Sequence, residues 1–174
     1  PGCGKTYVAE QYVKKKDYVI VTPFNTQCDE LGRNGKPSCT AYRLLGVGID
    51  DQALGRGLDV SELDVVVLDE IFLFPRRILR KLWSFMQSHP DIRFLATGDY
   101  CQNPSVEPAR HQYEADGTWD VQDIVSFMFP TSLKLNVIKR VKSESDRTAY
   151  PLIKAALFNG KKTVLDVVKE NQEY

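Results

Sequence analysis

Residues 1–22, PGCGKTYVAEQYVKKKDYVIVT, place a glycine-rich turn, a helical pattern and a β-branched run in immediate succession. Within residues 6–16 the apolar side chains recur near helical spacing, which predicts a helix. Residues 18–22 have the composition of a short strand that is buried on both faces. The stretch therefore predicts a turn, a helix and a strand that belongs to a parallel sheet.

The same alternation of strands and helices continues to about residue 99. Further helices are expected over residues 24–35 and 75–90, and further strands over 64–70 and 92–99. The glycine-rich residues 44–59 predict a surface loop between them. Strands that alternate with helices are typical of an α/β fold, in which a parallel sheet is flanked by helices.

Composition and length set the class of protein. The chain has 174 residues, 43% of them hydrophobic, and equal numbers of basic and acidic side chains, which fits one globular domain and part of a second. The pattern changes near residue 113, so we predict a first domain over 1–112, and a linker with the start of a second domain over 113–174. No apolar run reaches the roughly 18 residues of a membrane span, so we expect no membrane partner.

Four scattered cysteines and two distant histidines form no zinc-binding pattern, and the cysteines are typical of a reduced, intracellular protein. Their simplest role is to fill small spaces in a core or loop.

The opening turn contains the end of a phosphate-binding loop. Gly4, Lys5 and Thr6 fill the last three positions of G-x-x-x-x-G-K-[ST], and the first glycine would lie two residues before Pro1. We therefore expect the chain to begin inside this loop, as part of a longer protein. Glycines let the backbone N–H groups point inward, the lysine contacts phosphate, and the threonine hydroxyl binds magnesium. The alternative is a glycine turn before a helix.

Two later strands also end in polar side chains. Asp69 and Glu70 end one strand, and Gly98, Asp99 and Gln102 follow the other. Because ligands of open parallel sheets bind outside the carboxyl ends of the strands, these groups suit metal binding, water activation and phosphate sensing. Taken singly, they could be solvated acids and an ordinary loop. Together with the opening turn, they predict a nucleotide hydrolase.

The chain resembles the first RecA-like motor domain of superfamily 1 helicases, truncated at both ends. The matching segments are PGCGKT (motif I), VTPFNTQCDEL (motif Ia), CTAYRLLG (the threonine motif after it), VVVLDE (motif II), ATGDYCQNPSV (motif III) and LKLNVIKR (motif IV). The G-D-x-x-Q core of motif III is specific to this superfamily. The likeness runs from Pro1 to about Arg147, and no motif V or VI follows residue 150.

The resemblance implies a RecA-like P-loop NTPase fold, ATP and Mg²⁺ as cofactors, and roles for individual residues. The expected nucleotide contacts are Gly2, Cys3, Gly4, Lys5, Thr6, Asp69, Gln102 and Arg140. Among these, Thr6 and Asp69 would hold magnesium, and Gln102 would couple the nucleotide to the nucleic-acid groove. Arg140 would reach the γ-phosphate, with Lys139 and Arg147 as weaker candidates, and Glu70 would be the general base. Asn103 departs from many relatives in motif III.

Contacts to a nucleic-acid backbone are expected from Thr22, Asn25 and Thr40, whose hydroxyls and amides can bond phosphate without reading sequence. Phe24 and Tyr42 could stack on bases. The alternatives are caps and turns for the polar residues, and core positions for the aromatic ones.

The predicted function is ATP-dependent movement along single-stranded nucleic acid, with a second RecA-like domain as partner. Two alternatives stay open: a non-catalytic remnant that serves as a binding module, and a P-loop NTPase without motor function. Retention of Lys5, Asp69, Glu70 and Gln102 speaks against decay. The short spacing between motifs favours a compact replication or viral-type helicase.

Overall fold

The computed structural model describes residues 3–48, 52–53, 55–100 and 119–135. The chain divides into two compact units. One runs from Thr6 to Leu133, and the other combines Pro1–Lys5 with Lys134–Tyr174. The architecture below is that of the first unit. Of the second unit, only residues 3–5 and 134–135 are described.

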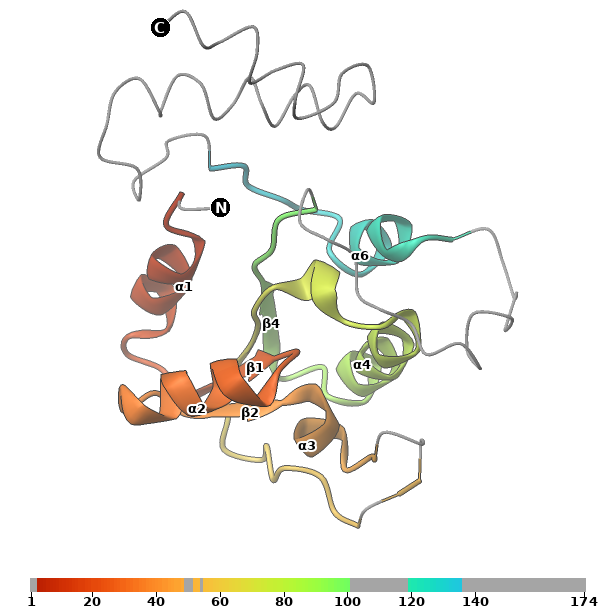
Figure 1. The fold of residues 1–174 in the computed structure, drawn as a ribbon, viewed down its shortest axis with the longest axis horizontal. Coiled ribbons are helices and arrows are strands. Elements are labelled where there is room, and N and C mark those ends of the chain that lie inside the picture. The colour runs from red at the N-terminus through yellow and green to blue at the C-terminus, as the bar shows by residue number, and fades with distance from the viewer. Residues whose placement is uncertain (1–2, 49–51, 54, 101–118, 136–174) are drawn as a thin grey trace, which may run out of the picture. The chain divides into compact units, whose positions relative to one another are not determined.

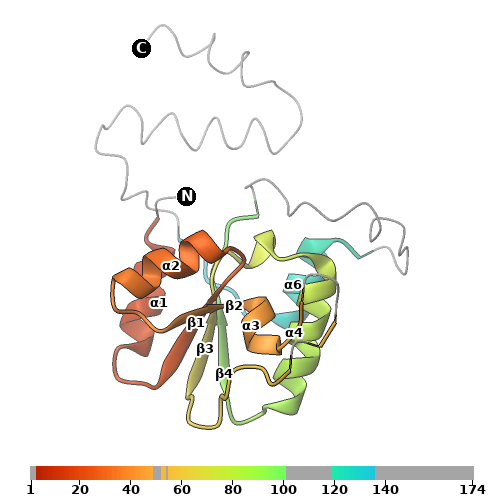
Figure 2. The ribbon, with the colours of Figure 1, turned by 60° about the horizontal axis from the view of Figure 1, so that its bottom comes forward.

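A four-stranded sheet, parallel throughout, forms the centre of the first unit (Figures 1 and 2). Its strands are β1 (Tyr18–Thr22), β2 (Ser38–Thr40), β3 (Val65–Leu68) and β4 (Arg93–Ala96), in the order β2-β1-β3-β4. Thr22 lies opposite Thr40, and Leu68 lies opposite both Val21 and Ala96. All four strands therefore end at one edge, which we call the carboxyl edge.

Helices cover both faces of this sheet. They are α1 (Lys5–Val13), α2 (Asn25–Arg33), α3 (Ala41–Leu45), the 3-10 turn η1 (Ile71–Leu73), α4 (Arg76–Ser88) and α6 (Val121–Met128). Figure 2 shows α1 and α2 on one face and α3, α4 and α6 on the other. Among the described residues, no helix is both long and apolar enough to cross a membrane.

Alternate residues of each central strand feed two separate cores. On β3, Val65 and Val67 pack with α1 and α2, whereas Val66 and Leu68 pack with α3, α4 and α6. All four are 2% exposed or less. Because both faces are covered, every position of β3 must be apolar, and this explains the unbroken VVVL run.

The predicted elements are found, with small shifts at their ends. The helix expected over residues 24–35 is α2, and Gly35 follows its end with a φ of +71°. Pro75 directly precedes α4, where its missing N–H costs no helical hydrogen bond. β2 and α3 were not predicted. Residues 44–59 were expected to be a loop, but α3 extends to Leu45 before the chain turns at Gly46, whose φ is +66°.

Helix α6 belongs to the same core as α4. Ile124, Val125 and Met128 are buried with the apolar face of α4, and a capping box between Asp120 and Asp123 starts the helix. From the sequence, residues 121–128 are expected in the segment 113–174. In the structure they lie in the compact unit that continues to Leu133.

Candidate functional site

Polar side chains gather where the apolar strands end. Asp69 follows β3 directly, and Thr97 follows β4 directly. The backbone N–H of Asp69 donates to the carbonyl of Val21 at 2.9 Å, and that of Thr97 donates to the carbonyl of Leu68 at 2.9 Å. These bonds extend the sheet ladder by one residue, and so they fix both side chains at the carboxyl edge.

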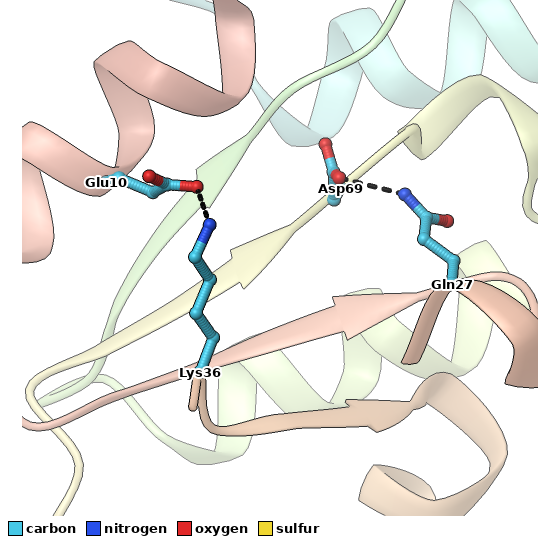
Figure 3. Close-up of polar contacts among 4 residues, drawn as sticks. All are labelled: Glu10, Gln27, Lys36 and Asp69. Carbon is cyan, nitrogen blue, oxygen red and sulfur yellow. Dashed lines mark hydrogen bonds and ion pairs between the residues drawn. The ribbon is translucent and has the colours of Figure 1, made fainter. Parts of the chain in front are cut away.

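The Asp69 carboxylate is held from two sides. It is 5% exposed, and Gln27 of α2 donates from Nε2 to Oδ2 at 3.0 Å (Figure 3). The Thr97 hydroxyl donates to Oδ1. Both donors are uncharged, so they orient the carboxylate and satisfy it without adding positive charge.

A small pocket lies between α1 and the sheet, next to this carboxylate. It is lined by Thr6, Ala9, Glu10, Val13, Ile20, Val67 and Asp69, and its volume is about 10 Å³. The hydroxyl-bearing Thr6 and the acidic Asp69 thus line the same pocket. The surface that this pocket exposes is apolar. Hydroxyl and carboxylate oxygens are the ligand type that Mg²⁺ prefers, so Thr6 and Asp69 fit this ion by residue type.

An ion pair ties α1 to the chain leaving α2. Lys36 Nζ lies 2.5 Å from Glu10 Oε1, and each side chain is 29% exposed (Figure 3). A pair this accessible contributes at most about 1 kcal/mol to stability. The pair joins α1 to the chain that follows α2, on the face of the sheet that these two helices cover.

Glu70 sits at a sharp turn out of the sheet. Its backbone is left-handed, with φ 52° and ψ 49°, and it is the one non-glycine residue with positive φ in the described part of the chain. The N–H of Ile71 donates to the carbonyl of Thr97 at 2.8 Å, which fixes the turn from the next strand. Such a conformation costs about 1 kcal/mol or more for a residue with a Cβ, and strain of this kind often marks functional sites.

Gly98 allows the end of β4 to pass close to η1. A Cβ at this position would lie 2.7 Å from Cδ2 of Phe72 and 3.1 Å from Cγ2 of Ile71. Those are closer than ordinary van der Waals contacts, so a larger residue would push η1 aside. The glycine of the G-D pair therefore has a packing role beside the side chains of Ile71 and Phe72.

The phosphate-loop residues are described only in part. Gly4 has a φ of +82°, and no atom lies within 4 Å of where its Cβ would be. Lys5 is the first residue of α1, and Cys3 is partly exposed. Gly2, Gln102 and Arg140 lie outside the described residues, as do Lys139, Arg147 and Asn103.

The candidate nucleic-acid contacts differ in accessibility. Thr22 is 0% exposed and donates its hydroxyl to the carbonyl of Phe24 at 3.0 Å. The hydroxyl of Thr40 accepts from the N–H of Arg43 at 3.3 Å and caps α3. Both threonines thus make cap and turn contacts, which are the alternative to a role in nucleic-acid binding. Asn25, by contrast, is exposed at the start of α2.

The two aromatic candidates also differ. Phe24 is 52% exposed at the N-terminus of α2. Tyr42 packs against the core, and its hydroxyl accepts from Nη2 of Arg77 at 3.2 Å. Phe24 and Asn25 therefore form the exposed surface at the carboxyl edge beside β1.

Two residues of the site were missed in the sequence. Thr97 could have been found, because it follows an apolar strand just as Asp69 does. Gln27 lies inside a helix and carries no local signal.

The described cysteines are free thiols, and burial raises the pKa of Cys39 to about 12. Among the described residues, no group of three His, Cys, Asp or Glu side chains could hold a metal.

A parallel sheet with helices on both faces, a glycine turn opening α1 and an acid at the end of β3 define an α/β, RecA-like fold. The solved structures with this fold include Bacteroides Pif1 bound to single-stranded DNA, which covers 99% of this chain with a TM-score of 0.69 and 17% sequence identity. A second is Pif1 from a study of DNA unwinding at forked duplexes, which covers 97% of this chain with a TM-score of 0.67 and 17% sequence identity. A third is Bacteroides Pif1 in complex with ADP-AlF4, which covers 97% of this chain with a TM-score of 0.61 and 14% sequence identity.

These comparisons confirm the predicted fold class. The chain covers 44%, 45% and 42% of those three Pif1 chains, which is less than half of their length. No protein-family model and no curated protein matches the sequence. At this level of identity the likeness to Pif1 helicases concerns the fold.

Proposed function

We propose that the chain is the first motor domain of a superfamily 1 helicase, which hydrolyses ATP and couples hydrolysis to movement along single-stranded nucleic acid. The observation that carries the proposal is the shared pocket of Thr6 and Asp69 at the carboxyl edge. The fold gives further support, because its solved neighbours include helicases bound to single-stranded DNA and to ADP-AlF4.

The nucleotide phosphates would bind at the N-terminus of α1. Gly2, Cys3 and Gly4 would supply backbone N–H groups, and the positive φ of Gly4 suits a loop that turns these groups inward. Lys5 would add its positive charge at the β- and γ-phosphates. The first turn of α1 contributes the positive end of its dipole to the same place.

Thr6 and Asp69 would hold magnesium, and their oxygens suit this ion. Bound magnesium neutralises phosphate charge and helps to orient the phosphates. The hydrogen bonds from Gln27 and Thr97 keep the Asp69 carboxylate in one orientation before the ion arrives. The protein therefore presents a preorganised ligand rather than a mobile one.

Glu70 would accept a proton from the attacking water at its carboxylate. Its left-handed backbone is braced by the hydrogen bond from the N–H of Ile71 to the carbonyl of Thr97. Gln102 and Arg140 remain candidates for sensing the γ-phosphate, as the resemblance implies.

The nucleic-acid strand would contact Asn25 and Phe24 at the start of α2. The amide suits a phosphate and the exposed ring suits a base. Thr22 and Thr40 would support this surface through their turn and cap bonds. A second RecA-like domain would complete the motor.

The change Lys5→Ala in the full-length protein tests the proposal, with Lys15→Ala as a matched control because Lys15 is exposed beyond α1. ATP hydrolysis is measured with and without single-stranded DNA or RNA. We expect stimulation by one of these strands, and a loss of about 100-fold or more in Lys5→Ala only. Unstimulated hydrolysis in the parent would indicate a P-loop NTPase without motor function, and no hydrolysis would indicate a binding module.

A further inference from the structure

Gln27 connects two parts of the molecule that have different proposed roles. It is the third residue of α2, directly after the exposed Phe24, Asn25 and Thr26. Its amide reaches past the end of β1 to the carboxylate that ends β3, with a distance of 3.0 Å between Nε2 and Asp69 Oδ2 (Figure 3).

We propose that Gln27 is a positioning residue: it fixes the Asp69 carboxylate for metal binding, and it links the metal to strand binding at the first turn of α2. This inference rests on the proposed function. It adds a residue and a direction of coupling that the motif assignments do not contain.

The hydrogen bonds to the Asp69 carboxylate support the proposed positioning role of Gln27. Thr97 bonds Oδ1 and Gln27 bonds Oδ2, so the two donors together prevent rotation of the carboxylate plane. Removing the Gln27 donor would leave one oxygen of a buried carboxylate unsatisfied. Outer partners that orient a metal ligand typically contribute about 10- to 100-fold to metal affinity.

The position of Gln27 in α2 supports the proposed link between metal binding and strand binding. A helix moves as a rigid segment, so a strand that binds Asn25 and shifts the first turn of α2 also shifts Gln27. That shift changes how the amide holds Asp69. By thermodynamic linkage, metal binding at Asp69 must then change strand affinity by the same factor.

The first test measures metal affinity directly in the full-length protein. Manganese replaces magnesium, and its free signal is followed by electron paramagnetic resonance in the presence of ADP. The variants are Gln27→Leu, which keeps the size but removes the donor, and Gln27→Asn, which keeps the amide but shortens the reach. Gln87→Leu is the matched control, since Gln87 is exposed near the end of α4.

We expect both Gln27 variants to bind manganese about tenfold more weakly or worse, with the control unchanged. Metal-free ADP affinity and the melting temperature separate this effect from misfolding, because a purely structural role would alter those values and leave metal affinity intact in the folded fraction. Unchanged manganese affinity in both folded variants would overturn the positioning role.

The second test measures coupling between strand and metal. Manganese affinity is determined with and without oligo-dT or oligo-U. We expect one oligonucleotide to change the manganese affinity of the parent protein several-fold. In Gln27→Leu, the ratio of manganese affinities with and without that oligonucleotide should fall close to one. A factor of one in the parent, or an undiminished factor in the variant, would overturn the link.

The two proposals fail in different ways. If the parent protein does not bind manganese and ADP together, the proposed function fails and Gln27 has no metal ligand to position. If the parent binds both and the Gln27 variants bind them equally well, the proposed function stands and the inference about Gln27 is wrong.

Discussion

Glu70 occupies a backbone region that side chains with a Cβ rarely adopt, and it directly follows the acid that lines the pocket. Its neighbours hold it there: Ile71 bonds the carbonyl of Thr97, and Gly98 leaves room for Ile71 and Phe72. Backbone strain that the surrounding structure holds in place is typical of functional sites, and Glu70 fits this description.

Comparing Glu70→Asn with Glu70→Val tests this interpretation, because both remove the carboxylate but only asparagine tolerates positive φ well. We expect both to lose about 100-fold or more in hydrolysis, the usual contribution of a general base. The valine variant should be less stable than the asparagine variant by about 1 kcal/mol, measured by urea unfolding. Equal stabilities would show that the turn is not strained, and retained hydrolysis would exclude Glu70 as the base.

The sequence predicts single residues well where a strand places them. Asp69 and Glu70 follow an apolar strand, so their position at the carboxyl edge was predictable before any contact was known. Gln27 was not, since its importance depends on the side-by-side arrangement of β1 and β3. A helical glutamine becomes a partner of Asp69 only through this tertiary contact.

At the scale of elements, two glycines that follow α3, Gly46 and Gly57, are closely packed. A Cβ on Gly57 would lie 2.4 Å from the carbonyl oxygen of Leu44, and one on Gly46 would lie 2.7 Å from the carbonyl oxygen of Gly55. The backbone therefore folds against the end of α3 at distances that only glycine permits.

Two alanine substitutions should have opposite effects on the free energy of unfolding. Gly57→Ala should lower it by about 2 kcal/mol, because backbone must move to admit the methyl group. Gly32→Ala should raise it by about 0.5 kcal/mol, since Gly32 lies within α2 and the nearest atom to its Cβ is Ser38 Oγ at 4.0 Å. Chemical denaturation measures both, and an unchanged or raised free energy of unfolding in Gly57→Ala would contradict the close packing at Gly57.

The sequence predicts the strands that are buried on both faces, and it misses the shortest strand and helix. β1 and β3 are buried on both faces, so their apolar runs are unambiguous. β2 has three residues and α3 has five, which is too short for a periodic pattern to emerge. Their existence depends on pairing with β1 and on the Thr40 cap.

At the scale of the whole molecule, parallel topology explains why residues far apart in sequence meet. The order β2-β1-β3-β4 sends every described strand to the same edge, and α1 brings Thr6 to that edge on one face. The alternation of strands and helices predicted this architecture. The position of α6 in the core was not predictable from the sequence. The amphipathic pattern of residues 121–128 is short, and it follows the weakly patterned residues after 113.

The most direct measurement is a crystal structure of the full-length protein with ADP, Mg²⁺ and a phosphate analogue. We expect the metal within coordination distance of Thr6 and of Asp69, directly or through one water, with the phosphates at the N-terminus of α1. A nucleotide bound on another face of the sheet, with Thr6 and Asp69 both remote from the metal, would contradict it.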